Sequence, residues 1–180
     1  LVPQVGGVLA EVLFTEGQSV KKGQVLARID PRQYQQALAQ ARGQRAKDEA
    51  QLSAARLTLQ RYQRLWDQDS IARQDVDTQA ALVKQLEGVV EADRASERAA
   101  QLNVGYTTIR SPIDGRIGLR TVDPGNLVSA GSTTGIATVT QMNPIDVVFS
   151  VPQDRVPDVL AAQKAAGAGK LPVQALNRER

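Results

Sequence analysis

Hydrophobic residues follow two different spacings along this chain. In residues 5–30 they alternate with polar residues over short stretches, which is typical of β-strands. The pattern predicts strands from Val8 to Phe14, around Val20 and from Val25 to Ile29. Gly17 and Gly23 lie between these stretches, and glycine favours turns because it adopts positive φ without a steric penalty.

The same unit occurs a second time, in residues 109–137. With an offset of 108 positions, glycines fall on glycines and apolar residues on apolar residues. The matching glycines are Gly7, Gly17 and Gly23 with Gly115, Gly125 and Gly131, and the matching apolar residues are Leu1, Val5, Leu9 and Val20 with Ile109, Ile113, Ile117 and Val128. We therefore interpret the two segments as halves of one β-sandwich, with these six glycines at its structural turns.

Residues 31–103 separate the halves and have a helical period. Asp30 and Pro31 suit a helix start, with Asp at the N-cap and Pro at the first helical position. The first predicted helix, residues 31–66, carries one seam of heptad spacing with two polar interruptions. The predicted seam comprises Tyr34, Leu38, Ala41, Arg45, Asp48, Leu52, Ala55, Leu59, Tyr62 and Trp66.

A second helix is predicted for residues 72–103, after a break at residues 67–70. Its predicted seam comprises Leu82, Leu86, Val89, Ser96 and Ala100. Because the connection is short, the two helices should be antiparallel neighbours in a hairpin about 50 Å long. Four apolar residues fall off the predicted seams and suggest lateral contacts with a neighbouring hairpin: Leu57, Val76, Val83 and Val90.

After the second β segment the alternation resumes. We predict a strand over residues 145–151, a helix over 152–166, a turn at 167–169 and a strand over 171–176. These elements are too few to form a hydrophobic core, so we interpret them as the start of a further β domain. The expected organisation is an elongated α+β chain with segments 1–30, 31–103, 104–140 and 141–180.

Composition narrows the function classes. The chain has no Cys and no His, which removes thiol and imidazole nucleophiles and zinc sites built on those ligands. The net charge of +3 is spread along the chain and gives little reason to expect nucleic-acid binding. No run of apolar residues is long enough to span a bilayer, and the first residues are not a signal peptide. We expect a fragment whose targeting segment is missing.

Four stretches carry a resemblance to a known family. Residues 108–118 and 122–128 (TIRSPIDGRIG and VDPGNLV) resemble the second lipoyl half of the periplasmic adaptor proteins, also called membrane fusion proteins, of the HlyD-like family. Residues 16–26 (EGQSVKKGQVL) look like their first half, and residues 142–147 (MNPIDV) are similar to the entry into their β-barrel. The branch that serves resistance-nodulation-division (RND) multidrug pumps is the most similar.

The resemblance implies a fold and a set of partners. It implies a split lipoyl-like sandwich interrupted by a coiled-coil hairpin and followed by a β-barrel, in an adaptor that connects an inner-membrane RND transporter to an outer-membrane TolC-type channel. The family works as a hexamer in the periplasm, attached to the inner membrane, here through the missing N-terminal segment. Its hairpin tip carries an Arg, Leu, Ser signature for channel docking; Arg61 and Leu65 match, Ala72 stands at the third position, and Ser70 is a nearby substitute.

No catalytic, cofactor or metal site is predicted. A true lipoyl or biotinyl domain presents a modified Lys between its halves, and Asp30-Pro31 stands there instead. The glycine-rich segments lack the spacing of a phosphate-binding loop. An adaptor of an ABC-type exporter or of a type I secretion system shares the same plan and remains an alternative, whereas a cytoplasmic coiled-coil scaffold leaves the split repeat unexplained.

Overall fold

A computed structural model describes residues 1–133, 135–144, 148 and 150–165, and the chain divides into two units, Leu1–Asn143 and Pro144–Arg180. Within the first unit, short strands form two sheets, with strand orders β4-β3-β1-β6 and β2-β5-β7. The strands are β1 (Gly7–Val12), β2 (Ser19–Val20), β3 (Val25–Ile29), β4 (Thr108–Arg110), β5 (Gly115–Arg120), β6 (Leu127–Val128) and β7 (Ala137–Thr140).

The two halves of the repeat complete each other's sheets. Gly7 of β1 pairs with Val128 of β6, and Gly115 of β5 pairs with Val20 of β2. These are equivalent pairs under the 108-residue offset, with the halves exchanged. The hydrogen bonds follow the same exchange, because Leu9 N donates to Asn126 O and Ile117 N donates to Gln18 O, both at 2.9 Å. The predicted pairing of the two segments in one β unit is thus confirmed.

Two structural reasons explain why glycine occupies the repeated positions. Gly17, Gly23, Gly125 and Gly131 adopt positive φ of 74°, 83°, 90° and 70°, at equivalent turns of the two halves. Gly115 instead allows close approach between strands, and Gly7, which has a φ of 153°, does so as well. A Cβ at position 115 would lie 2.9 Å from the carbonyl carbon of Thr140, and one at position 7 would lie 2.6 Å from Ile29 Cγ2.

The β core consists of two small apolar clusters, to which both halves contribute. One cluster contains Val5, Leu9, Ala27, Ile29, Ile109, Val128 and Ile136, and the other contains Val20, Leu26, Ile117 and Ala137. Leu1 and Phe14 pack against both clusters. Strand β3 of the first half supplies residues to both clusters, and the second half adds Ile109 to one and Ile117 to the other, so neither cluster is built from one half of the repeat.

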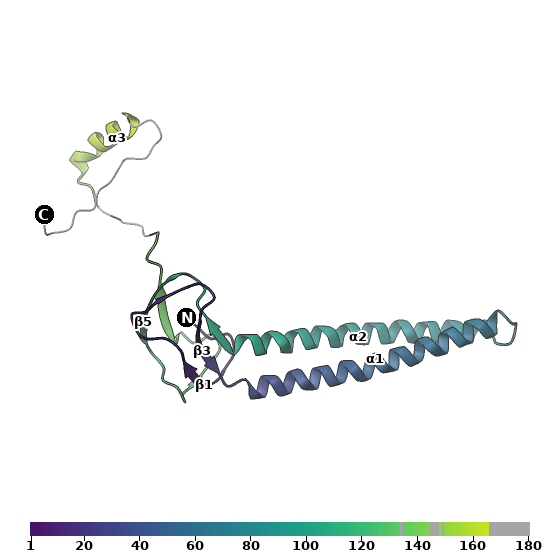
Figure 1. Cartoon of the computed structure of the whole chain (residues 1–180). Helices are drawn as coiled ribbons and strands as arrows, with labels where there is room; N and C mark the ends of the chain where they lie inside the picture. Colours follow the sequence, from purple (N-terminus) through teal and green to yellow (C-terminus); the bar gives the residue numbers. More distant parts are fainter. Residues whose placement is uncertain (134, 145–147, 149, 166–180) are drawn as a thin grey trace. The chain divides into compact units, whose positions relative to one another are not determined.

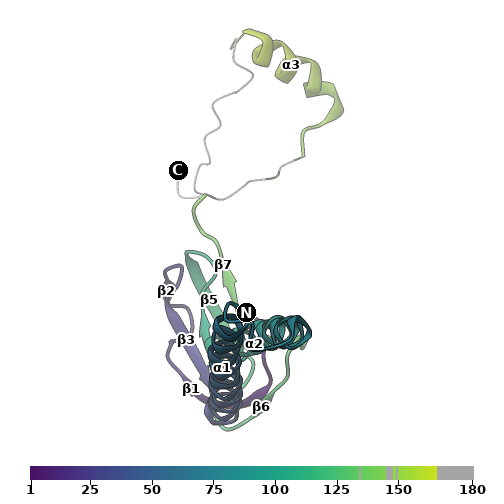
Figure 2. The same ribbon diagram turned by 90° about the vertical axis from the view of Figure 1, so that its right-hand side faces the viewer.

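Two long helices leave the β unit side by side (Figures 1 and 2): α1 (Arg32–Trp66) and α2 (Arg73–Tyr106). Helix α1 starts one residue later than predicted, and the Asp30 carboxylate accepts a hydrogen bond from the Arg32 backbone N–H at 3.0 Å. The helices are joined to the sheets at their base, where Ile29 N donates to Thr107 O and the Tyr34 hydroxyl donates to Gly6 O at 2.6 Å.

The heptad seam predicted for α1 is buried or half-buried from Tyr34 to Tyr62, but Trp66 is 42% exposed. Trp66 lies at the end of α1, where only the turn and the first residues of α2 can cover it. The seam predicted for α2 was right at Leu86 and Ala100 and wrong at its other three positions. Its inward-facing residues are Val76, Gln79, Val83, Leu86, Val90, Asp93, Glu97, Ala100 and Val104, whereas Leu82, Val89 and Ser96 are exposed.

The second unit contains a 3-10 turn, η1 (Gln153–Arg155), followed by helix α3 (Val156–Ala165). These two elements fall within the helix predicted for residues 152–166. The described positions of the predicted strand, residues 148, 150 and 151, are not in a strand, and its other positions lie outside the described residues. The turn predicted at 167–169 and the strand predicted at 171–176 also lie outside them.

Candidate functional site

The connection between α1 and α2 is a tight turn that presents the hairpin tip. Asp69 has a positive φ of 53°. Ser70 N donates to Leu65 O, and Asp69 N donates to Trp66 O, both at 2.9 Å. This pair of bonds around a left-handed residue is a Schellman motif, which satisfies carbonyls at the end of α1. The main chain of the tip is therefore well defined.

The side chains of the tip form an apolar and cationic surface that is exposed to solvent. Leu65 and Trp66 are 40% and 42% exposed, and neither belongs to the buried cluster between the helices. Arg61 and Arg64 are exposed, and the described residues include no ion-pair partner for either. Leu65 is therefore not a buried residue at the end of the seam. An exposed apolar pair beside free guanidinium groups is suited to a protein interface.

The structure places the remaining predicted tip residues in the turn itself. Ser70 is exposed, and its hydroxyl donates to Gln68 O at 3.1 Å. Ala72 is the N-cap residue of α2, and no side chain caps this helix. The position that the family signature fills with Ser is thus a position where a hydroxyl would cap a helix, and Ala cannot do so.

The residues predicted for lateral contacts separate into two groups. Leu57 is 54% exposed and Val76 is half-buried. Val83 and Val90 are 8% and 3% exposed and pack with Leu52 and Ala55 between the helices, so their assignment to lateral contacts was wrong. A side chain buried within its own hairpin cannot contact a neighbour.

Leu82 and Val89 are the outward-facing residues that sequence reasoning missed, with exposed fractions of 41% and 37%. Adjacent apolar pairs at 82–83 and 89–90 fit either of two heptad phases, so hydrophobic spacing alone could not separate them. The polar residues carried the missing signal. In the observed phase Glu97 lies in the seam and faces Arg45 of α1, whereas the predicted phase put Ser96 there and left Arg45 without an acidic partner.

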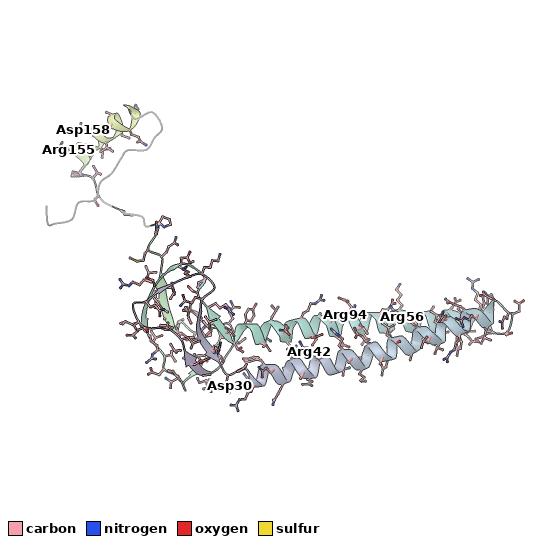
Figure 3. All side chains as sticks on the ribbon, viewed as in Figure 1. Asp30, Arg42, Arg56, Arg94, Arg155 and Asp158 are labelled. Carbon is pink, nitrogen blue, oxygen red and sulfur yellow. The ribbon has the colours of Figure 1, made fainter. Side chains whose placement is uncertain are left out.

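Ion pairs join the two helices along the hairpin, and their arginines are labelled in Figure 3. Arg42 contacts Glu97 at 3.0 Å, Arg94 contacts Glu49 at 3.2 Å, and Arg56 contacts Glu87 at 2.6 Å. Each such pair at a partly exposed site contributes about 0–1 kcal/mol to stability. Their larger effect is on register, because sliding one helix along the other would separate all three pairs. These charged side chains thus pair with each other within the hairpin.

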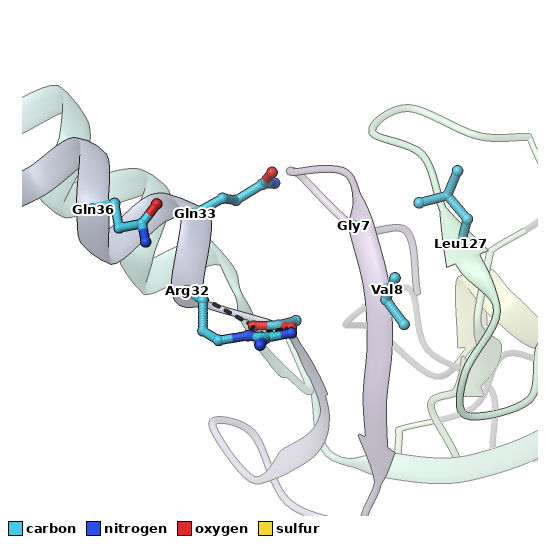
Figure 4. A pocket seen from close by; sticks show the side chains of 7 residues that line it. Gly7, Val8, Arg32, Gln33, Gln36 and Leu127 are labelled. Carbon is cyan, nitrogen blue, oxygen red and sulfur yellow. Dashed lines mark hydrogen bonds and ion pairs between the residues drawn. The ribbon is translucent and has the colours of Figure 1, made fainter.

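A hollow of about 420 Å³ lies where the hairpin meets the sheets (Figure 4), lined by Gly7, Val8, Asp30, Arg32, Gln33, Gln36 and Leu127. Its two charged groups pair with each other, with Arg32 Nη2 2.6 Å from Asp30 Oδ2. The hydrogen bonds from Arg32 hold the pKa of the Asp30 carboxyl below its usual value. The hollow therefore contains no carboxyl poised for acid-base chemistry.

Metal binding and membrane spanning are not indicated by the part of the chain that the structure describes. Among the described residues, no group of His, Cys, Asp and Glu could hold a metal ion. No helix in the described ranges is both long and apolar enough to cross a membrane. The features that stand out are thus surfaces of the hairpin, at its tip and along its outward faces.

Comparisons with known proteins agree with this geometry. Residues 1–140 match the family model described as the RND MFP barrel-sandwich hybrid domain. The chain is 51% identical over 162 residues to the multidrug resistance protein MdtA of Pantoea ananatis, a match that covers 90% of this chain and 40% of that protein. It is 50% identical over 175 residues to MdtA of Klebsiella pneumoniae, covering 97% and 42%.

A solved structure also resembles the chain. The MacA-MexA chimeric protein, which contains the α-hairpin domain of Pseudomonas aeruginosa MexA, matches with a TM-score of 0.51 and 29% identity. The match covers 77% of this chain and 45% of the chimera. The chain spans about two fifths of the length of the MdtA relatives it matches.

Proposed function

Because the chain belongs to the family of RND membrane fusion proteins, we propose that it is part of a periplasmic adaptor for multidrug efflux. In this role it connects an inner-membrane RND transporter to an outer-membrane channel of the TolC type. The observation that carries the proposal is the family match over the whole first unit, together with a long hairpin whose tip is apolar and exposed.

The proposal assigns channel docking to the hairpin tip. Arg61 and Leu65 make the contact, and Ser70 and Ala72 lie beside them in the turn. The free guanidinium of Arg61 supplies hydrogen bonds, and Leu65 supplies an apolar anchor. Truncating such an anchor at an interface costs about 2 kcal/mol or more of binding energy.

The lipoyl-like description of the β unit belongs to the same proposal. Its support is the exchanged pairing of two equivalent halves, which places the hairpin between β3 and β4. The position that carries a modified Lys in true lipoyl domains is Asp30-Pro31, so we assign no attached cofactor and no enzymatic role. Residues 141–180 are assigned to the start of a β-barrel domain.

The adaptor is proposed to work as a hexamer, held to the inner membrane through an N-terminal segment of the full protein. Lateral contacts between hairpins are assigned to Leu57, with Val76 at their margin. Leu82 and Val89 join this set because both are exposed apolar side chains on α2.

The test is a Leu65→Ser substitution made at the gene's own locus in the source bacterium. Drug efflux, measured as accumulation of a fluorescent pump substrate in cells, should fall to the level of a strain without the adaptor. The melting temperature of the purified chain should change little, because Leu65 is outside the buried seam. The substitution therefore changes the surface of the tip and leaves the packing between the helices as it is.

Leu102→Ser is the matched control, since Leu102 is an exposed leucine near the other end of α2. It should leave efflux intact. Equal loss of efflux in both variants, or a collapse of the fold in Leu65→Ser, would contradict the docking role.

A further inference from the structure

The middle of the hairpin seam contains two carboxylates that interact with each other. Asp48 of α1 is only 5% exposed. Asp93 of α2 interacts with Asp48 through its side chain, and its Oδ2 is buried with no hydrogen-bond partner. Asp93 as a residue is half-buried, but the carboxylate oxygen that lacks a partner is out of contact with water, so ionising both interacting carboxyls carries a penalty.

The remaining contacts of the pair leave its charge largely uncompensated. Gln44 Nε2 donates to Asp48 Oδ2 at 2.7 Å, which supplies one neutral donor. Lys47 Nζ lies 4.0 Å from Asp48 Oδ1, but the lysine side chain is 62% exposed, so water weakens the attraction. Lys47 also attracts the Asp93 carboxylate and opposes the rise of its pKa, but this is the smallest of the influences on it, and Asp93 Oδ2 receives no hydrogen bond.

The other charged groups around the pair form ion pairs with other residues. Arg45 Nη1 contacts Glu97 at 2.5 Å, and Arg45 Nε lies 3.7 Å from Glu49 and is buried with no hydrogen-bond partner. Arg94 contacts Glu49 at 3.2 Å and Glu91 at 3.6 Å. The titratable and charged groups that α1 and α2 place around the pair are Arg45, Lys47, Glu49, Glu91, Arg94 and Glu97.

We propose that Asp48 and Asp93 share one proton across the seam, and that this proton makes the pairing of the two helices firmer in mildly acidic solution than at neutral pH. With the proton on Asp93, its Oδ2–H donates to the Asp48 carboxylate and the orphaned oxygen gains a partner. Without it, two like charges face each other within the seam. The inference concerns the hairpin itself and does not depend on the proposed function.

The direction of the pH effect follows from linkage. Burial, followed by the interaction with Asp48, raises the pKa of the Asp93 carboxyl above its usual value. A carboxyl whose pKa is higher in the folded state than in the unfolded state binds its proton more tightly when folded. Its contribution to stability is therefore fully present below the ordinary carboxyl pKa, about 3.9, and is lost as the pH rises through the raised pKa.

The experiment compares the chain with an Asp93→Asn variant by thermal melting, followed by circular dichroism, at several pH values between 4.5 and 7.5. The Asn amide can donate to Asp48 at every pH, so it replaces the shared proton permanently. The variant should melt at a higher temperature than the unmodified chain at pH 7.5, and this difference should shrink as the pH falls. The other carboxylates are the same in both chains, so their pH dependence cancels when the two melting temperatures are subtracted.

Asp77→Asn is the matched control, because Asp77 is a largely exposed aspartate of α2 outside the seam. Its difference from the unmodified chain should not depend on pH in this way. A second measurement needs no variant: carboxyl carbon NMR should show one of the two seam aspartates titrating well above an ordinary Asp. A flat Asp93→Asn difference across the pH range, or ordinary titration of both carboxyls, would overturn the proposal.

Discussion

At the scale of single residues, glycines decide whether the strands can approach each other. Gly115 of β5 lies against the backbone of Thr140 of β7, whereas Gly118 of the same strand has only ordinary contact distances, with Thr138 O at 3.5 Å. The first position has no room for a methyl group, and the backbone opposite it cannot rotate away. The second position has room.

We therefore predict that Gly115→Ala destabilises the chain by about 1–3 kcal/mol, the usual cost of overpacking. Gly118→Ala is the control and should change stability far less. Chemical denaturation with both variants measures the difference. Equal stabilities for the two variants would show that β5 and β7 are not as close as the structure places them.

At the scale of elements, the hairpin and the β unit have separate cores. Leu52, Ala55, Val83 and Val90 form the cluster between the helices, and none of them belongs to the two β clusters. The ends of the hairpin also lie next to each other, because Arg28 of β3 pairs with Thr108 of β4. Removing the helices therefore requires only a short bridge.

Replacing residues 33–101 with a short Gly/Ser linker should leave a folded β protein that melts cooperatively. The reason is that every strand pair and all buried residues of both β clusters lie outside the removed segment, which takes away only Tyr34 from the periphery of the first cluster. Near-ultraviolet circular dichroism and thermal melting of the shortened chain provide the measurement. An unfolded product would show that the β unit depends on the hairpin for stability.

At the scale of the whole molecule, the hairpin leaves apolar side chains without partners in one copy. Leu57, Leu82 and Val89 are exposed on helices whose own seam is already filled. Single exposed apolar residues are common on protein surfaces, but the proposed hexamer gives these a partner in the neighbouring hairpin. Weak lateral contacts of this kind become effective when a pump and a channel hold the copies together.

Cysteine pairs test this arrangement cleanly, because the sequence has no Cys of its own. Leu57→Cys combined with Leu82→Cys should form crosslinks between copies in cells that express pump and channel. Leu57→Cys combined with Val83→Cys is the control, since position 83 is buried within its own hairpin and should crosslink poorly. Absence of crosslinks with 57 and 82, and with 57 and 89, would remove the lateral contacts from the proposal.

The sequence by itself determined the elements that depend on local patterns. The glycine repeat showed that two distant segments share one β unit, because equivalent turns require equivalent positive-φ positions. The heptad spacing of α1 gave its buried face from Tyr34 to Tyr62. The tip residues Arg61 and Leu65 came from the family resemblance, and their role as a contact is still a prediction.

Only the tertiary structure decided the phase of α2 and the exchange between the β halves. Either phase of α2 puts apolar residues in the seam, and the choice was made by contacts with α1, including Arg45 with Glu97. The exchanged strand pairing is likewise invisible in the repeat, because a half that closed on itself would show the same glycines and apolar positions. In both cases the deciding energy comes from a partner segment distant in the chain, which a local pattern does not contain.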